Sequence, residues 1–228
     1  MKHSGKARTA AFKMLVVTLV LTLLFPVIGF VATLIGSAMV AFSIVLLILW
    51  FVFALFVLYF FRDPEARVPA GKNLVVSPGH GKVDVIDTVD EPLFMGGSCR
   101  RISMFLSVLD VHVQNAPVGG RVAYYRYSEG QFVNAMKTES AAHNENALFG
   151  LEAAEPAGAR VGFRLIAGVL ARRIVPWISV GDEVARGERI SLIQFGSRVD
   201  LYLPASATIQ AKLGDRVVGG ETVLAVLE

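Results

Sequence analysis

The sequence contains a single cysteine, Cys99, among its 228 residues. One cysteine can form neither an intrachain disulfide nor a two-cysteine metal site, so both kinds of small stabilised domain are excluded and a reducing compartment fits. Its neighbours Ser98 and Arg100 are typical of a strand end. We therefore interpret Cys99 as a small structural residue and not as a nucleophile.

Charge is missing from a long part of the chain, because no Asp, Glu, Lys or Arg occurs between Met14 and Phe61. The run raises the apolar content of the chain to 54%. A membrane-spanning helix needs about 20 apolar residues, so the run predicts two helices, over 14–34 and 38–61, with a turn at Gly36-Ser37. A cleaved signal peptide would have an apolar region of only about 7–15 residues, and the longer run favours a membrane anchor.

Acidic residues are absent from the first 61 positions, which carry four of the 22 basic residues and leave 18 basic against 19 acidic residues in the remainder. The basic surplus is a flank of the apolar run and not a patch on a folded surface, which argues against nucleic-acid binding. Basic flanks tend to stay in the cytoplasm, so a two-helix hairpin predicts an inner-membrane protein whose residues from Arg62 onward lie on the cytoplasmic side. The four basic residues are Lys2, Lys6, Arg8 and Lys13.

Beyond the apolar run, short β-branched segments alternate with Gly, Pro and Asp. This pattern predicts a mostly β fold for residues 62–228, preceded by an anchor over 1–61. The expected strands are 74–76, 82–86, 101–106, 121–125, 161–166, 189–193, 200–203 and 222–226. Residues 129–146 show no steady alternation, and we expect a loop with some helix there.

A short pattern occurs twice in the β region, at 180–188 and at 213–221. Each copy has a Gly-Asp turn, an inward Val and a second turn that ends in Gly-Glu before an apolar strand. Paired turns of this kind suit the compact β-sandwich of lipoyl and biotinyl carriers, so we expect part of the fold to resemble it. The pattern leaves open a membrane-anchored carrier module, although neither Lys82 nor Lys212 follows a methionine as a modified lysine would.

Six further blocks occur in one order between residues 60 and 200. Together they resemble the short bacterial or archaeal type of phosphatidylserine decarboxylase, over nearly all of 60–228. An apolar anchor ahead of them suits an enzyme whose substrate is a lipid. The blocks are Phe60-Phe61-Arg62-Asp63-Pro64, Val76-Ser77-Pro78 with Gly81-Lys82-Val83, Arg101-Ile102-Ser103-Met104-Phe105-Leu106-Ser107, Leu109-Asp110-Val111-His112-Val113 with Ala116-Pro117, Ile166-Ala167-Gly168 with Ala171-Arg172-Arg173-Ile174, and Phe195-Gly196-Ser197-Arg198-Val199-Asp200.

The resemblance implies an enzyme that removes carbon dioxide from phosphatidylserine to give phosphatidylethanolamine. Its electron sink would be made from the chain itself, because Ser197 attacks the carbonyl of Gly196 and the chain divides into 1–196 and 197–228. A pyruvoyl group at residue 197 then forms a Schiff base with the substrate. Gly196 leaves the carbonyl unobstructed and permits unusual backbone angles. The two chains are expected to stay associated at the membrane, a homo-oligomer is a further expectation, and no metal is implied.

The resemblance also places His112 as the acid/base residue, which could deprotonate Ser197 or move a proton during decarboxylation. At position 80 the family has an aspartate, and this chain has His80. A second departure follows His112, where Gln114-Asn115 replaces an Asn-Arg pair.

These departures leave two questions about the candidate site. His80 is included as an alternative base, and Asp84 or Asp110 is the acid that could take the place of the missing aspartate. A family member that has lost its catalytic chemistry is the other function left open, since a fold and its motifs can outlive an activity.

Overall fold

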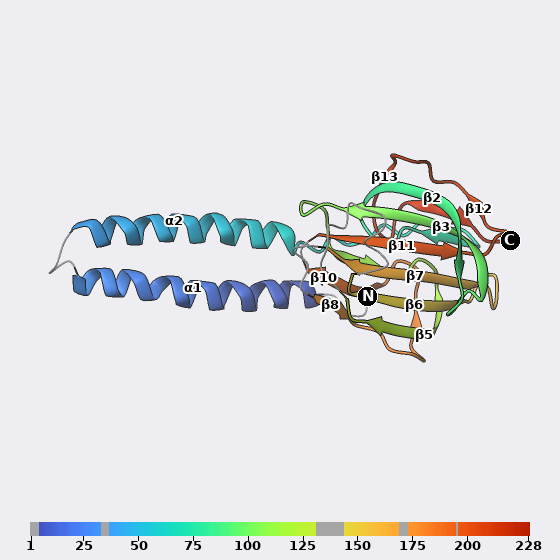
Figure 1. Ribbon diagram of the computed structural model, residues 1–228, viewed down its shortest axis with the longest axis horizontal. Coiled ribbons are helices and arrows are strands. Elements are labelled where there is room, and N and C mark those ends of the chain that lie inside the picture. The colour runs from blue at the N-terminus through green and yellow to red at the C-terminus, as the bar shows by residue number, and fades with distance from the viewer. Residues whose placement is uncertain (1–4, 33–36, 131–143, 169–172, 195) are drawn as a thin grey trace. The chain divides into compact units, whose positions relative to one another are not determined.

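The protein is described by a computed structural model that covers residues 5–32, 37–130, 144–168, 173–194 and 196–228. The chain divides into two compact units, Gly5–Asp63 and Pro64–Glu228. The first unit is helical and the second consists of strands, as Figure 1 shows. The change from helix to strand follows the change in the sequence from an uncharged apolar run to short β-branched segments.

Two long helices form the first unit. Helix α1 spans Lys6–Ala32 and α2 spans Ser37–Phe60, and both are long and apolar enough to cross a membrane. Polar atoms join them, because Trp50 Nε1 donates to Thr18 Oγ1 at 3.1 Å and Ser43 Oγ donates to the Phe25 carbonyl at 3.3 Å. Most of their large apolar side chains are exposed, and this is the surface that lipid would cover.

The start of the first helix differs from the expectation. Helix α1 begins eight residues before residue 14, because the segment 6–13 is rich in Ala, Lys and Arg, which are strong helix formers. The expected start was wrong because it followed hydrophobicity alone. The second helix, expected over 38–61, differs by one residue at each end. Gly36 of the predicted turn lies outside the described residues, and Ser37 is the first residue of α2.

One antiparallel sheet of eight strands dominates the second unit, in the order β13-β2-β3-β11-β7-β6-β5-β9. In that order the strands span Arg216–Val217, Gly81–Glu91, Gly97–Leu106, Ser197–Leu203, Arg160–Ala167, Asn146–Ala153, Gly120–Ser128 and Glu183–Val184. Strand β11 pairs with β3 on one side and β7 on the other. The segment that begins at Ser197 therefore lies in the middle of the sheet.

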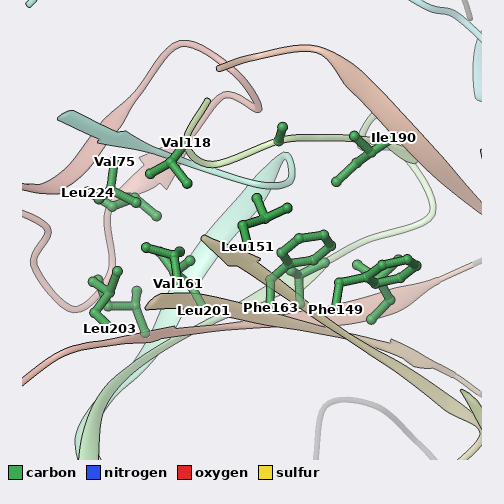
Figure 2. Close-up of a cluster of buried hydrophobic side chains, with 14 of the residues drawn as sticks. Val75, Val118, Phe149, Leu151, Val161, Phe163, Ile190, Leu201, Leu203 and Leu224 are labelled. Carbon is green, nitrogen blue, oxygen red and sulfur yellow. The ribbon is translucent and has the colours of Figure 1, made fainter. Parts of the chain in front are cut away.

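Two three-stranded sheets complete the unit. One has the order β1 (Leu74–Val76), β14 (Val223–Val226), β12 (Thr208–Ile209), and the other has the order β4 (Val113–Asn115), β10 (Arg189–Gln194), β8 (Arg173–Pro176). Figure 2 shows Phe149, Phe163 and Leu201 of the large sheet in one buried cluster with Ile190 and Leu224. Full burial of such a side chain contributes about 1.5–3 kcal/mol, so this core holds β11 in place.

The mostly β prediction is confirmed, and each of the eight expected strands overlaps an observed one. Strand β6 was missed because its sequence contains no β-branched residue. Its pairing with β5 and β7 on both sides overrides that low propensity. Residues 131–143 of the expected loop lie outside the described residues, and Asn146 at its end belongs to β6.

The second unit consists of two similar halves. The first half contains β1–β3 and β11–β14, and the second contains the continuous segment β4–β10, which is inserted between β3 and β11. Each half has a four-stranded portion of the large sheet and one three-stranded sheet. A register shift recurs at the same place, between Val83 and Val85 and between Val122 and Tyr124. The Gly-Asp turns of the repeated sequence pattern make the same hydrogen bonds in both halves, Gly214 and Asp215 with Val83 and Gly181 and Asp182 with Val122.

The central strands of the sheet, β7 and β11, are also counterparts. The strand registers place Phe163 of β7 and Leu201 of β11 at equivalent positions. The sequence Gly158-Ala159-Arg160-Val161 then corresponds to Gly196-Ser197-Arg198-Val199. Both glycines have a left-handed backbone, with φ of +79° and +70°. One repeated position thus carries alanine in one half and serine in the other.

Candidate active site

Ser197 begins β11 and is fully buried. It lies between Leu106 of β3 and Ala167 of β7 in the sheet register. Within the described part of the chain its Oγ has no hydrogen-bond partner. A buried hydroxyl without a partner costs free energy that the fold must offset elsewhere, so such a group points to a chemical role more than to a structural one.

The bond before Ser197 is shaped by a left-handed residue. Gly196 has φ of +70°, a conformation that residues with a side chain rarely adopt. Among the described residues other than its chain neighbours, the atom nearest to a Cβ at this position would be Val108 Cγ1, at 3.7 Å. The backbone conformation, and not a lack of space, therefore requires glycine. Phe195, which precedes it, lies outside the described residues.

His112 lies directly before β4 and is fully buried beside the Gly196–Ser197 bond. Its Nδ1 is 2.9 Å from the Asp110 carbonyl oxygen, and the Gly196 N–H donates to its Nε2 at 3.1 Å. A carbonyl oxygen can only accept, so Nδ1 carries the proton and the lone pair of Nε2 accepts from the Gly196 N–H. The structure thus holds His112 against the backbone of Gly196, the residue that precedes Ser197.

The backbone around His112 is fixed by two further contacts. Its carbonyl oxygen accepts from the Ile193 N–H at 3.1 Å and from Gln114 Nε2 at 2.7 Å. The side-chain oxygen of Gln114, Oε1, in turn accepts from Ser191 Oγ at 2.8 Å. Because Ile193 and Ser191 belong to β10, which runs toward Gly196, the histidine and the bond share one support.

The two expected substitute acids are held by arginines. Asp84 binds Arg198 through both carboxylate oxygens, at 2.8 and 2.5 Å, and the Arg198 side chain is 1% exposed. Asp110 accepts from the Ser107 N–H at 2.8 Å and pairs with Arg216 at 3.3 Å. Asp110 therefore orients His112 through its backbone carbonyl, while Asp84 anchors the residue that follows Ser197.

His80 is partly exposed and lies against Gly219, in the turn before β14. A Cβ on Gly219 would lie 3.1 Å from His80 Nε2 and 2.8 Å from Asn115 Oδ1, so both side chains contact this glycine. Asn115 also donates through Nδ2 to the Gly187 carbonyl at 2.9 Å. The two departures from the family pattern, at 80 and 115, are therefore neighbours in space.

One further group at the site was not found from the sequence. The Gly168 N–H, just beyond β7, donates to the Gly196 carbonyl oxygen at 3.1 Å. The same peptide unit is held from its other end, because Asn144 Nδ2 donates to the Ala167 carbonyl at 2.7 Å. The motif Ile166-Ala167-Gly168 marked this segment, but a backbone donor has no side-chain signature. Among the described residues no cluster of three or more His, Cys, Asp or Glu side chains could hold a metal.

Comparisons with known proteins agree with one another. A family model described as phosphatidylserine decarboxylase matches residues 53–225. The phosphatidylserine decarboxylase proenzyme of Symbiobacterium thermophilum is 47% identical over 171 residues, covering 75% of this chain and 79% of the relative. That of Zymomonas mobilis is 48% identical over 172 residues, covering 72% and 69%. That of Novosphingobium aromaticivorans is 41% identical over 213 residues, covering 88% and 83%.

Proposed function

Because this chain belongs to the phosphatidylserine decarboxylase family, we propose that it is a proenzyme that cuts its own Gly196–Ser197 bond and uses the new pyruvoyl group at residue 197. It is a lyase that decarboxylates phosphatidylserine to phosphatidylethanolamine. The observation that supports self-cleavage best is the buried hydroxyl of Ser197, which has no hydrogen-bond partner among the described residues and follows a left-handed glycine whose N–H donates to His112 Nε2.

Cleavage begins with a proton transfer. His112 Nε2 gives up its hydrogen bond from the Gly196 N–H and accepts the hydroxyl proton of Ser197 instead. The Ser197 Oγ attacks the Gly196 carbonyl carbon. The C–N bond breaks, the Ser197 nitrogen receives the proton from His112, and an ester replaces the peptide. Loss of the Ser197 α-proton then expels Gly196 as a carboxylate at the end of 1–196.

The new end of the smaller chain completes the cofactor. The dehydroalanine left at residue 197 takes up water and releases ammonia, which yields the pyruvoyl group. That group supplies an electron sink for the carbanion that forms when carbon dioxide leaves. Ser197 is the residue that fits this role, since its hydroxyl binds no group in the part of the chain that the structure describes. Arg198, bound by Asp84, keeps the start of β11 in the sheet.

The remaining expectations belong to the same proposal. Strand β11 lies between β3 and β7, and this pairing supports continued association of 1–196 with 197–228. The two apolar helices support membrane association, with the inner membrane as the site and the β unit on the cytoplasmic side. A homo-oligomer and a lipoyl-like sandwich portion stay predictions.

Intact-mass spectrometry of the purified full-length protein tests the proposal. The expected result is two chains, 1–196 and 197–228, with a blocked N-terminus on the smaller one. Ser197→Ala should give one uncut chain and no decarboxylase activity. Ser103→Ala is the matched control, because it also removes a buried hydroxyl from the same sheet, and it should still be cut.

The alternatives predict different masses. An uncut wild-type chain without activity would indicate a member that has lost its chemistry, and a lysine adduct on an uncut chain would indicate a carrier. Decarboxylation by Ser197→Ala would exclude the pyruvoyl assignment. His112→Ala and His80→Ala then separate the two candidate bases, and we expect only the first to abolish cleavage, because His112 contacts Gly196.

A further inference from the structure

We propose that the backbone N–H of Gly168 stabilises the oxyanion that forms on the Gly196 carbonyl oxygen during self-cleavage, and that Asn144 is the residue that positions this N–H. The inference rests on the proposed cleavage at 196/197. It concerns how the step is accelerated, and it adds two residues to the chemistry.

The geometry places a donor on the reacting oxygen. The Gly168 N–H is 3.1 Å from Gly196 O, the oxygen of the bond to be cut. The register of β7 and β11 pairs Ala167 with Ser197, so this hydrogen bond lies at the end of the ladder, next to the nucleophile. Donor distances of about 2.7–3.1 Å to the oxyanion are typical of groups that stabilise such intermediates.

The chemistry requires such a donor. When Ser197 Oγ adds to the Gly196 carbon, the carbonyl π electrons move to the oxygen, which becomes negatively charged, and the hydroxyl proton passes to His112. Gly168, Ala167 and Ser197 are all buried, so water does not screen this charge. A hydrogen bond from a fixed dipole is worth more in such an environment than in water.

Asn144 fixes the direction of that dipole. The Ala167 carbonyl and the Gly168 N–H belong to one planar peptide unit and point in opposite directions. Asn144 is 1% exposed, and its Nδ2 donates to the Ala167 oxygen at 2.7 Å. The Gly168 N–H is bound to Gly196 O at the other end. Asn144 therefore restrains the whole peptide unit and acts on the reaction only through Gly168.

An amide-to-ester exchange tests the donor without a change of side chain. Gly168→glycolic acid, introduced into the full-length chain by nonsense suppression in a cell-free system with nanodiscs, replaces the N–H by oxygen. Mild base cuts at the ester and verifies its incorporation. We expect the appearance of 1–196 and 197–228 to slow by about 10²–10³-fold, as for the loss of one oxyanion donor.

Two controls separate catalysis from stability. Gly162→glycolic acid makes the same exchange within the same strand, and it should be cut at close to the wild-type rate. In a Ser197→Ala background, which is not cut, both esters should lower the melting temperature by similar amounts. A slowing that is equal in the two esters would assign the bond a structural role and overturn the proposal.

Asn144→Leu tests the positioning role. It should slow cleavage by itself but add nothing to the slowing of the Gly168 ester, because both act on one hydrogen bond. Additive effects would exclude action through Gly168. Cleavage of the Gly168 ester at the wild-type rate would overturn the oxyanion role and leave the proposed function intact. A wild-type chain that is never cut would instead remove the proposed function itself.

Discussion

Asp200 lies three residues after Ser197 on β11, and its side chain is 1% exposed. The nearest cation described is Arg101, whose Nη1 is 3.9 Å from Asp200 Oδ2. Burial raises the pKa of the Asp200 carboxyl above its ordinary value of 3.8, and a hydrogen bond from Ser103 and the charges of nearby arginines offset only part of this effect. Folding therefore favours the protonated form of this carboxyl.

Asp200→Asn should raise the stability of the protein above that of the wild type, and the gain should be larger at pH 8 than at pH 4. The raised pKa means that folding favours the protonated form, so wild-type stability from this group is full below pH 3.8 and falls as pH rises through the folded pKa. Asparagine does not titrate, so the variant lacks this loss of stability with rising pH. Melting temperatures of both proteins in detergent, measured from pH 4 to 8 in a Ser197→Ala background, check the prediction. The control is Asp87→Asn, which removes a more exposed partner of Arg101, and a gain there as well would contradict the argument.

Cys99 shows a residue whose role the sequence indicated correctly. It is a buried free thiol, and burial together with the charges of Glu91 and Asp90 raises its pKa to about 11. A thiol in this state is a poor nucleophile at neutral pH. His112 shows the opposite case, because the sequence suggested an aspartate as its orienting partner and the structure provides the Asp110 carbonyl instead.

At the scale of elements, the two halves of the β unit supply a matched pair of turns before β7 and β11. Gly158 and Gly196 have the same left-handed conformation. Of the described residues outside their chain neighbours, none lies within 4 Å of a Cβ built at Gly158, and Val108 alone does at Gly196. Gly158 precedes an alanine that cannot cleave the chain. The left-handed glycine is therefore a requirement of the repeated fold. Ser197 is what the first half adds to it, and His112 comes from the segment directly before β4.

Gly158→Ala and Gly196→Ala should each destabilise the protein by about 1–2 kcal/mol, the cost of a left-handed residue with a side chain. Only Gly196→Ala should slow self-cleavage, because it alters the attacked carbonyl. Denaturant unfolding in a Ser197→Ala background measures the first effect, and gel analysis of the single variants measures the second. Slowed cleavage in Gly158→Ala would show that stability, and not local geometry, limits the reaction.

Elements with strong β-branched patterns were predictable, and those defined by their neighbours were not. Strand β1 was predicted with its bounds, since its Leu-Val-Val run is an apolar β-branched segment. Strands β9, β12 and β13 have two residues each and exist only because a partner strand binds them. The repeated Gly-Asp turns were visible in the sequence. The sequence did not show that the turns lead into β13 and β9, the two edge strands of one sheet.

At the scale of the whole molecule, the two helices set the topology. If both apolar helices span the membrane, as proposed, the chain returns to the side on which it began, and the basic flank predicts that this side is the cytoplasm. Tags on Met1 and Glu228 should both be digested by protease in inverted membrane vesicles and both be protected in right-side-out vesicles. Tags on opposite sides would indicate a single span and would refute the hairpin. A periplasmic reporter serves as the control for vesicle orientation.

The sequence by itself determined the two long apolar helices, the mostly β unit and the two motif blocks that contain His112 and Gly196-Ser197, because hydrophobic runs, β-branched segments and motif order are local properties of the chain. Only the tertiary structure decided that His112 and Gly196, 84 positions apart, meet, and that the Gly168 N–H lies on the Gly196 carbonyl oxygen. The physical reason is that the partner of a backbone N–H, the tautomer of a histidine and the register of a strand cannot be read from residue types. They are fixed only when the strands pair.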